Sequence, residues 1–216
     1  MDIIYADNQI VVCVKPAGVL STDEPGGLPE LLRRELETEN IRTVHRLDRV
    51  VGGLMVLART RHAASDMGRQ VMAGGIGKEY FAVIEGCPEM GEGTLRDHLW
   101  RNKAERKTYA LPSATAETQE AELDYKVLET RGGMSAVRIR LHTGRTHQIR
   151  AQFSSRGLPL AGDKKYGAGG EHGVALWSCA LGFSHPKSGE MLEFFCLPPD
   201  EYPWNQFECF KENENR

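Results

Sequence analysis

The spacing of hydrophobic and polar residues changes several times along the chain, and each change marks a predicted element. Two β-rich runs, residues 3–5 and 9–15, flank Asp7 and Asn8, which favour a tight turn, so we expect an N-terminal hairpin. Leucines at positions 28, 31, 32 and 36 follow a helical spacing, and Pro29 suits a first helical turn. This segment is predicted to be a short amphipathic helix.

The next elements alternate between strand and helix. Residues 52–58 are almost wholly apolar and predict a central strand. Thr60 can cap a following helix, which we expect to stop at Gly74. Residues 78–86 again have the composition of a strand.

The second half of the chain starts with a polar segment. Residues 99–119 look irregular, and we expect them to leave the core, whereas 121–129 and 135–143 predict an antiparallel pair. Hairpins with interspersed helices indicate an α+β fold with a mixed, largely antiparallel central sheet and flanking helices. With 216 residues, 40% of them hydrophobic, we expect a single domain over residues 1–207 and a loose tail over 208–216.

Composition narrows the class of protein. The formal net charge of -3 argues against a generally basic coat but leaves room for one local basic face. No apolar run approaches the length of about eighteen residues that a membrane helix needs. The N-terminal stretch has neither a basic region nor a cleavage site, so we expect a cytoplasmic protein. The five cysteines form no C-x-x-C pair, which indicates neither a zinc site nor a disulfide framework.

The first motif with candidate catalytic residues is HRLD. It places His45, Arg46 and Asp48 within four residues, directly before the apolar strand. Gly52 and Gly53 follow, and residues without side chains let a loop fold tightly and let another group approach the backbone closely. Taken alone, this pattern is better explained by an aspartate that caps a turn.

A second candidate stretch is AVRIRLHTGRTHQIRAQF. Apolar residues alternate with basic ones over 137–142, which gives one core face and one cationic face. Thr146 can cap a helix that begins near His147 and carries His147 and Arg150 on one face. A cationic helix start suits an anion.

These motifs together resemble the RluA-type pseudouridine synthases, which isomerise uridine in RNA by exchanging a nitrogen glycosidic bond for a carbon one. The resemblance covers most of the chain from Ile3 to Pro199 and rests on HRLD, KEYFAV, TGRTHQIRAQF, GLPLAGDKKYG and LGFSHPKSGEMLEFFCLP. Val51 and Gly52 stand where the family usually has Thr and Ser, and Leu123 where it often has Thr. The pattern starts close to the first residue, which implies the compact form without an N-terminal RNA-binding domain.

The resemblance assigns roles to individual residues. Asp48 is implied to be the catalytic aspartate, which attacks the anomeric carbon or promotes a ring-opened or glycal route. Arg150 is implied to pair with Asp48, which opposes the rise in carboxylate pKa that desolvation in a base pocket causes. Tyr80 corresponds to a tyrosine that stacks on uracil and helps to remove the proton at ring carbon five. Arg46 is implied to occupy the space that the flipped base leaves.

Other basic residues receive less specific roles. His45 is expected to orient the loop by hydrogen bonding, and Lys78, Arg145 and His147 to contact RNA phosphates or support loops. The basic run over 101–107 fits either a phosphate tether or a solvated surface. The resemblance also implies ribosomal or transfer RNA as the partner, no membrane, no obligate protein partner, a monomer, and neither metal nor cofactor.

Two other functions are consistent with parts of the sequence. A non-catalytic RNA-binding or RNA-folding protein on the same scaffold would tolerate loss of Asp48 or Tyr80, and both are present. A phosphodiester hydrolase is suggested by His142 and His147 beside arginines, but no carboxylates and histidines share metal-ligand spacing. We therefore predict an RNA pseudouridine synthase.

Overall fold

The computed structural model describes residues 2–211, which group into two compact units. The first unit holds the chain up to Lys78 together with Trp177–Cys196, and the second holds Glu79–Leu176 and the chain from Leu197 on. The chain therefore passes between the units at three places, and neither unit is one continuous segment. The expectation of one domain over residues 1–207 did not include this interleaving, because no shift in composition marks the crossing points.

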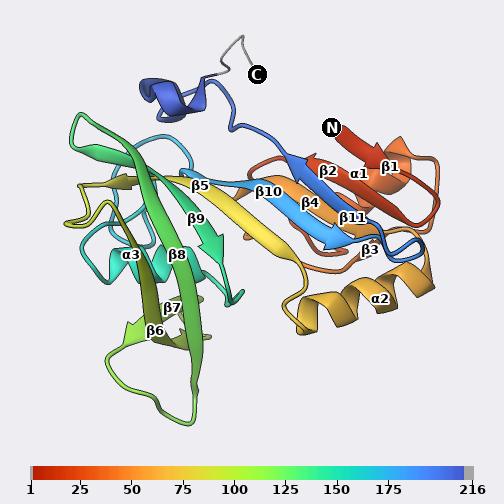
Figure 1. Ribbon diagram of the computed structural model, residues 1–216, viewed down its shortest axis with the longest axis horizontal. Coiled ribbons are helices and arrows are strands. Elements are labelled where there is room, and N and C mark those ends of the chain that lie inside the picture. Colours follow the sequence, from red (N-terminus) through yellow and green to blue (C-terminus); the bar gives the residue numbers. More distant parts are fainter. Residues whose placement is uncertain (1, 212–216) are drawn as a thin grey trace. The chain divides into compact units, whose positions relative to one another are not determined.

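The first unit is built on a mixed sheet. In it β2 pairs antiparallel with β1 and with β4, whereas β10 runs parallel to β4 at Gly52 and Gly53 and antiparallel to β11. A short strand, β3, also pairs with β4. The strands are β1 (Ile3–Ala6), β2 (Ile10–Lys15), β3 (Arg42–Thr43), β4 (Gly52–Ala58), β10 (Leu176–Ser184) and β11 (Met191–Phe195) (Figure 1).

Two helices belong to the first unit, α1 (Leu28–Glu35) and α2 (Arg61–Met72). The prediction that Thr60 caps α2 is confirmed, because its Oγ1 accepts the N–H of Ala63 at 3.0 Å. Ala63 and Met67 of α2 are fully buried in the core that the inner strands supply. No helix within the described part of the chain is long and apolar enough to cross a membrane.

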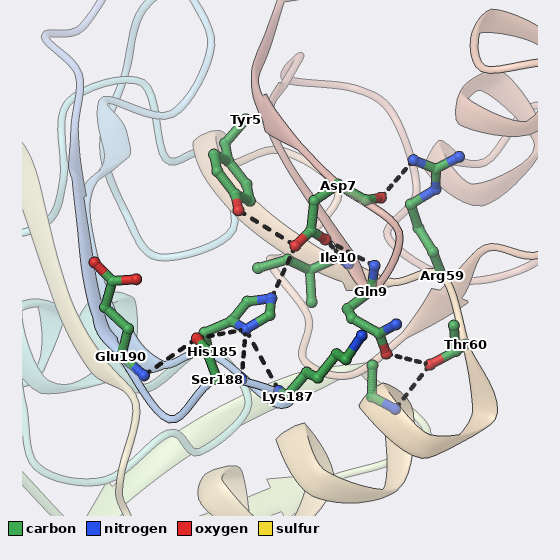
Figure 2. A network of polar contacts seen from close by, with 11 residues as sticks. Tyr5, Asp7, Gln9, Ile10, Arg59, Thr60, His185, Lys187, Ser188 and Glu190 are labelled. Atoms are coloured by element: carbon green, nitrogen blue, oxygen red, sulfur yellow. Dashed lines mark hydrogen bonds and ion pairs between the residues drawn. The ribbon is translucent and has the colours of Figure 1, made fainter.

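A polar network joins the turn after β1 to the turn after β10 (Figure 2). The Asp7 carboxylate accepts the N–H groups of Gln9 and Ile10 at 2.7 and 2.8 Å and contacts His185 Nε2 at 2.9 Å. His185 Nδ1 accepts the Ser188 N–H at 3.1 Å and lies 3.0 Å from the Ser188 hydroxyl. Ser188 forms these bonds within the turn that also holds His185. The contact between His185 and Asp7 then joins the β10–β11 hairpin to the β1–β2 hairpin.

The second unit contains an antiparallel sheet in the order β5-β9-β8-β6-β7 and one short helix. Its elements are β5 (Gly77–Glu85, whose first two residues belong to the first unit), β6 (Glu92–Asn102), β7 (Lys107–Leu111), β8 (Thr118–Arg131), β9 (Met134–Leu141) and α3 (Gln148–Ser154). The predicted α+β fold with largely antiparallel pairing is confirmed.

The prediction of irregular structure over residues 99–119 was wrong. Most of the segment lies in β6, β7 and the start of β8, and β6 pairs with both of the others. Leu95 and Leu99 are buried, and most residues between them remain at least partly exposed. A strand that buries so few side chains has too few apolar residues to be recognised by composition.

Two further expectations differ from the structure. α3 has His147, not Thr146, as its N-cap residue, and His147 has a left-handed backbone with φ of 55°. The expected loose tail from residue 208 starts instead with the 3-10 helix η2 (Glu208–Phe210), which follows η1 (Trp204–Gln206). Phe210 is buried against Phe81, so aromatic packing orders this segment, and residues 212–216 of the expected tail lie outside the described residues.

Candidate functional site

Asp48 lies half-buried on a loop whose two neighbouring residues are both anchored. Ser21 Oγ donates to the carbonyl of Leu47 at 2.8 Å and accepts the Leu47 N–H at 3.1 Å. The Gly18 N–H donates to the carbonyl of Arg49 at 2.7 Å. The segment that follows β2 therefore fixes the backbone on each side of Asp48.

Lys15 strengthens this anchoring from inside the protein. Its side chain is fully buried, and Nζ donates to the carbonyls of Pro16, Val19 and Arg49 at 2.9, 2.8 and 3.4 Å. Burial lowers the pKa of Lys15 to about 8, and the negative charge of Asp48 opposes this shift. Lys15 is the last residue of β2 and Ser21 lies in the segment that follows β2, and neither was among the residues predicted from the sequence.

The two glycines after the loop are required by the approach of β10. A Cβ on Gly53 would lie 2.3 Å from the carbonyl oxygen of Ser178, and the φ of Gly53 is 113°. A Cβ on Gly52 would lie 2.6 Å from a ring carbon of Trp177. These glycines were predicted to allow a tight loop and the close approach of another group, and the structure adds close packing against β10.

His45 is buried beneath the same loop. Its Nε2 accepts the N–H of Val56 in β4 at 3.1 Å, which places the ring proton of the neutral imidazole on Nδ1. Burial lowers the pKa of His45 to about 3, and the charge of Lys78 acts in the same direction. Burial likewise lowers the pKa of Lys78. Arg46 is exposed, in contrast to its neighbour.

In the second unit, Arg150 is held in a buried ion pair. Its Nε and Nη2 donate to the two carboxylate oxygens of Asp163 at 2.6 and 2.8 Å. The ring centroid of Tyr166 lies 5.0 Å from Arg150 Cζ. Asp163 and Tyr166 lie in the GDKKYG motif, and neither was among the site residues predicted from the sequence. The predicted contact between Arg150 and Asp48 stays a prediction.

His147 joins the same group of side chains. Its Nδ1 lies 2.9 Å from Tyr166 Oη and 3.4 Å from Arg101 Nη1. A guanidinium only donates, so Nδ1 is the acceptor and the ring proton lies on Nε2. The Thr108 N–H donates to Tyr166 Oη at 2.8 Å, which leaves the Tyr166 hydroxyl hydrogen to bind His147.

The remaining predicted residues divide by exposure. Tyr80 is buried on β5, opposite Ile139 of β9. Arg145 is exposed, and its Nε donates to the carbonyl of Glu120 at 3.0 Å. Among residues 2–211, no three His, Cys, Asp or Glu side chains cluster as ligands of a metal ion would.

Comparisons with known proteins match most of the chain to one family. A family model described as RNA pseudouridylate synthase matches residues 9–155. An uncharacterized RNA pseudouridine synthase, YlyB of Bacillus subtilis, is 32% identical over 215 residues, which cover 93% of this chain and 70% of that protein. The ribosomal large subunit pseudouridine synthase D of Haemophilus influenzae is 31% identical, and the match covers 94% of this chain and 68% of that protein.

Solved structures give the same result. Human RNA pseudouridylate synthase domain containing 1 superposes with a TM-score of 0.79 at 25% identity, over 92% of this chain and 83% of that one. Human RNA pseudouridylate synthase domain containing 4 has the same fold, with a TM-score of 0.77. The chain therefore belongs to the RNA pseudouridylate synthase family and is an isomerase of uridine in RNA.

Proposed function

We propose that this protein converts specific uridines in structured ribosomal or transfer RNA to pseudouridine, with Asp48 as the catalytic carboxylate and base flipping to expose the target. The observation that carries the proposal is the loop of Asp48. Both of its flanking residues are fixed by hydrogen bonds, and the buried ammonium of Lys15 holds the carbonyl of Arg49. A reacting carboxylate gains from such a fixed approach to the anomeric carbon.

Asp48 acts either as a nucleophile at the anomeric carbon or through a ring-opened or glycal route, and the ionised carboxylate serves each route. Tyr80 stacks on uracil and helps to remove the proton at ring carbon five. Arg150 pairs with Asp48 and supplies the countercharge of this carboxylate. The family resemblance supports these two assignments, together with the buried, rigidly held guanidinium of Arg150.

The RNA is bound through residues of several kinds. Arg46 is exposed and fills the space that the extruded base leaves in its stack. His45 orients the loop of Asp48, since its ring contacts the backbone of β4. Lys78, Arg145 and His147 contact phosphates or support the loops around them. The name of the Haemophilus relative, which refers to the large ribosomal subunit, favours ribosomal RNA.

The proposal is tested with RNA that carries tritium at uridine carbon five, since isomerisation releases this label. We expect Asp48→Asn to lower single-turnover release by at least roughly a hundredfold, because an amide is a poor nucleophile and carries no charge. RNA affinity should stay near that of the parent. The matched control is Asp23→Asn, an exposed aspartate that pairs with Arg33 in the same unit. Release within tenfold of the parent by Asp48→Asn would remove Asp48 from the mechanism.

A further inference from the structure

We propose that Asp163 and Tyr166 are positioning residues that set the orientation of the Arg150 guanidinium for the isomerisation. This inference rests on the catalytic role of Arg150 proposed above. Neither residue needs to touch the RNA, because each acts through its contact with Arg150. The inference gives a function to the GDKKYG motif, which lies next to α3 and not within it.

The ion pair between Arg150 and Asp163 fixes the guanidinium in one direction. Two nitrogens of one edge of Arg150, Nε and Nη2, meet the two oxygens of Asp163 at 2.6 and 2.8 Å. Two parallel contacts fix the rotation of the guanidinium in its own plane, which a single contact cannot do. The edge that carries Nη1 is thereby directed away from Asp163. Only 5% of the Arg150 side chain and 1% of the Asp163 side chain are exposed, so water does not compete for this geometry.

The ring of Tyr166 restrains the Arg150 guanidinium in a second direction. Its centroid lies 5.0 Å from Arg150 Cζ, a distance at which a cation is attracted to an aromatic face. The ring is itself held in place, because Tyr166 Oη is bound by the Thr108 N–H and lies 2.9 Å from His147 Nδ1. Asp163 therefore fixes the guanidinium within its plane, and Tyr166 limits its motion out of that plane.

Asp163 and Tyr166 both lie on one turn that is bound to α3. The Tyr166 N–H donates to the carbonyl of Asp163 at 2.9 Å, so the two side chains leave one compact turn. Ser154 Oγ donates to the carbonyl of Tyr166 at 2.7 Å. Ser154 lies one helical turn after Arg150 on α3, so this bond ties the turn to the helix that carries Arg150. The guanidinium, carboxylate and ring form one connected assembly.

Asp163 also allows the Arg150 guanidinium to be buried. A lone guanidinium would be costly to bury, and Asp163 supplies the countercharge inside the protein. Arg150 therefore presents N–H groups of fixed direction from a pair that is formally neutral. The competing explanation is that Asp163 serves only the stability of the fold, and the experiment must separate these two roles.

The test measures single-turnover pseudouridine formation and RNA affinity for Asp163→Asn, Tyr166→Leu and Tyr166→Phe. We expect Asp163→Asn to lower the rate by about tenfold or more while RNA affinity stays within about twofold, since the defect lies in orientation and not in binding. Tyr166→Leu should lower the rate by a similar factor. Tyr166→Phe keeps the ring and should lose less than Tyr166→Leu.

A double-mutant cycle identifies the route of the effect. In an Arg150→Lys background there is no fork for Asp163 to orient, so adding Asp163→Asn should change the remaining rate by less than about twofold. The matched control is Asp97→Asn, which breaks a second bidentate ion pair, with Arg156, at the end of the same helical segment. It should lower the thermal midpoint without changing the rate.

The outcomes separate the inference from the proposed function. A parent protein that forms no pseudouridine in any cellular RNA would overturn both. An active parent with an Asp163→Asn variant that is folded and equally fast would overturn the positioning role alone. So would an equal rate loss in the parent and Arg150→Lys backgrounds, because Asp163 would then act independently of Arg150. A paired apolar replacement, Arg150→Met with Asp163→Leu, should recover stability relative to Asp163→Leu alone and still be inactive.

Discussion

At the scale of single residues, the fully buried ammonium of Lys15 holds the backbone beside Asp48. Lysines are almost never fully buried, so Lys15 at the end of a strand gave no signal that its side chain turns inward. Its contact with Arg49 joins residues 34 positions apart and exists only in the fold. Asp163 and Tyr166 lie in the GDKKYG motif, but nothing in its sequence predicts that both side chains contact the Arg150 guanidinium.

The buried ammonium of Lys15 makes stability depend on pH in a defined window. Its pKa is about 8 in the folded protein and near 10.5 in an ordinary lysine. Between these values the unfolded chain binds the extra proton, so the free energy of unfolding should rise as pH increases from 8 to 10.5, by at most about 1.4 kcal/mol per pH unit. Below pH 8 and above pH 10.5 this contribution should be constant.

The measurement is urea unfolding of the parent and Lys15→Met at intervals from pH 7 to pH 10.5. The difference in unfolding free energy between the two should grow in favour of the parent across the window. Lys126→Met, at an exposed position of β8, controls for the replacement of a lysine by methionine. A parent-minus-variant difference that stays flat from pH 7 to pH 10.5 would show that Lys15 has no depressed pKa.

At the scale of elements, prediction succeeded where a strand or helix carries its own signal. The apolar run of β4 and the Thr60 cap of α2 are local features, and both were read correctly. β6 and β7 were missed because neighbouring strands, not their composition, stabilise them. The cap of α3 was misassigned because His147 adopts a left-handed backbone, which is uncommon for residues other than glycine.

Gly53 tests how closely β4 and β10 pack, and Gly68 of α2 is the comparison position. Gly53→Ala places a Cβ 2.3 Å from the Ser178 carbonyl at a φ of 113°, so we expect a loss of at least about 2 kcal/mol of unfolding free energy. Gly68→Ala, in α2 with nothing within 4 Å of its added Cβ, should instead gain about 0.5–1 kcal/mol. Thermal and urea unfolding measure both. Equal stability of the two variants would contradict the close approach of β10.

At the scale of the whole molecule, family membership fixes the reaction class, whereas charge says how RNA must be bound. A net charge of -3 cannot attract RNA uniformly, so affinity has to come from local basic residues. Each such residue contributes either a phosphate contact or a contact with a base. These two contributions respond differently to salt and to RNA structure, and this difference can be measured for Arg46.

If Arg46 fills the place of an extruded base, its contribution to the reaction rate depends on how well that base was stacked. Arg46→Ala should then lose most rate on a target uridine in a well-stacked RNA, where extrusion costs roughly a few kcal/mol. It should lose less on the same site loosened by neighbouring mismatches, because extrusion is there partly accomplished. A phosphate contact predicts similar losses on both RNAs and a salt dependence shallower by about one phosphate.

The experiment compares single-turnover rates of the parent and Arg46→Ala on the stacked and loosened RNAs at two salt concentrations. Arg34→Ala is the control, since Arg34 is also exposed in the first unit and pairs with Glu30 of its own helix. It should match the parent on both RNAs. We expect the loss caused by Arg46→Ala to be at least about fivefold larger on the stacked RNA, which corresponds to about 1 kcal/mol of the extrusion cost. Equal losses with a reduced salt slope would instead identify Arg46 as a clamp on the RNA backbone.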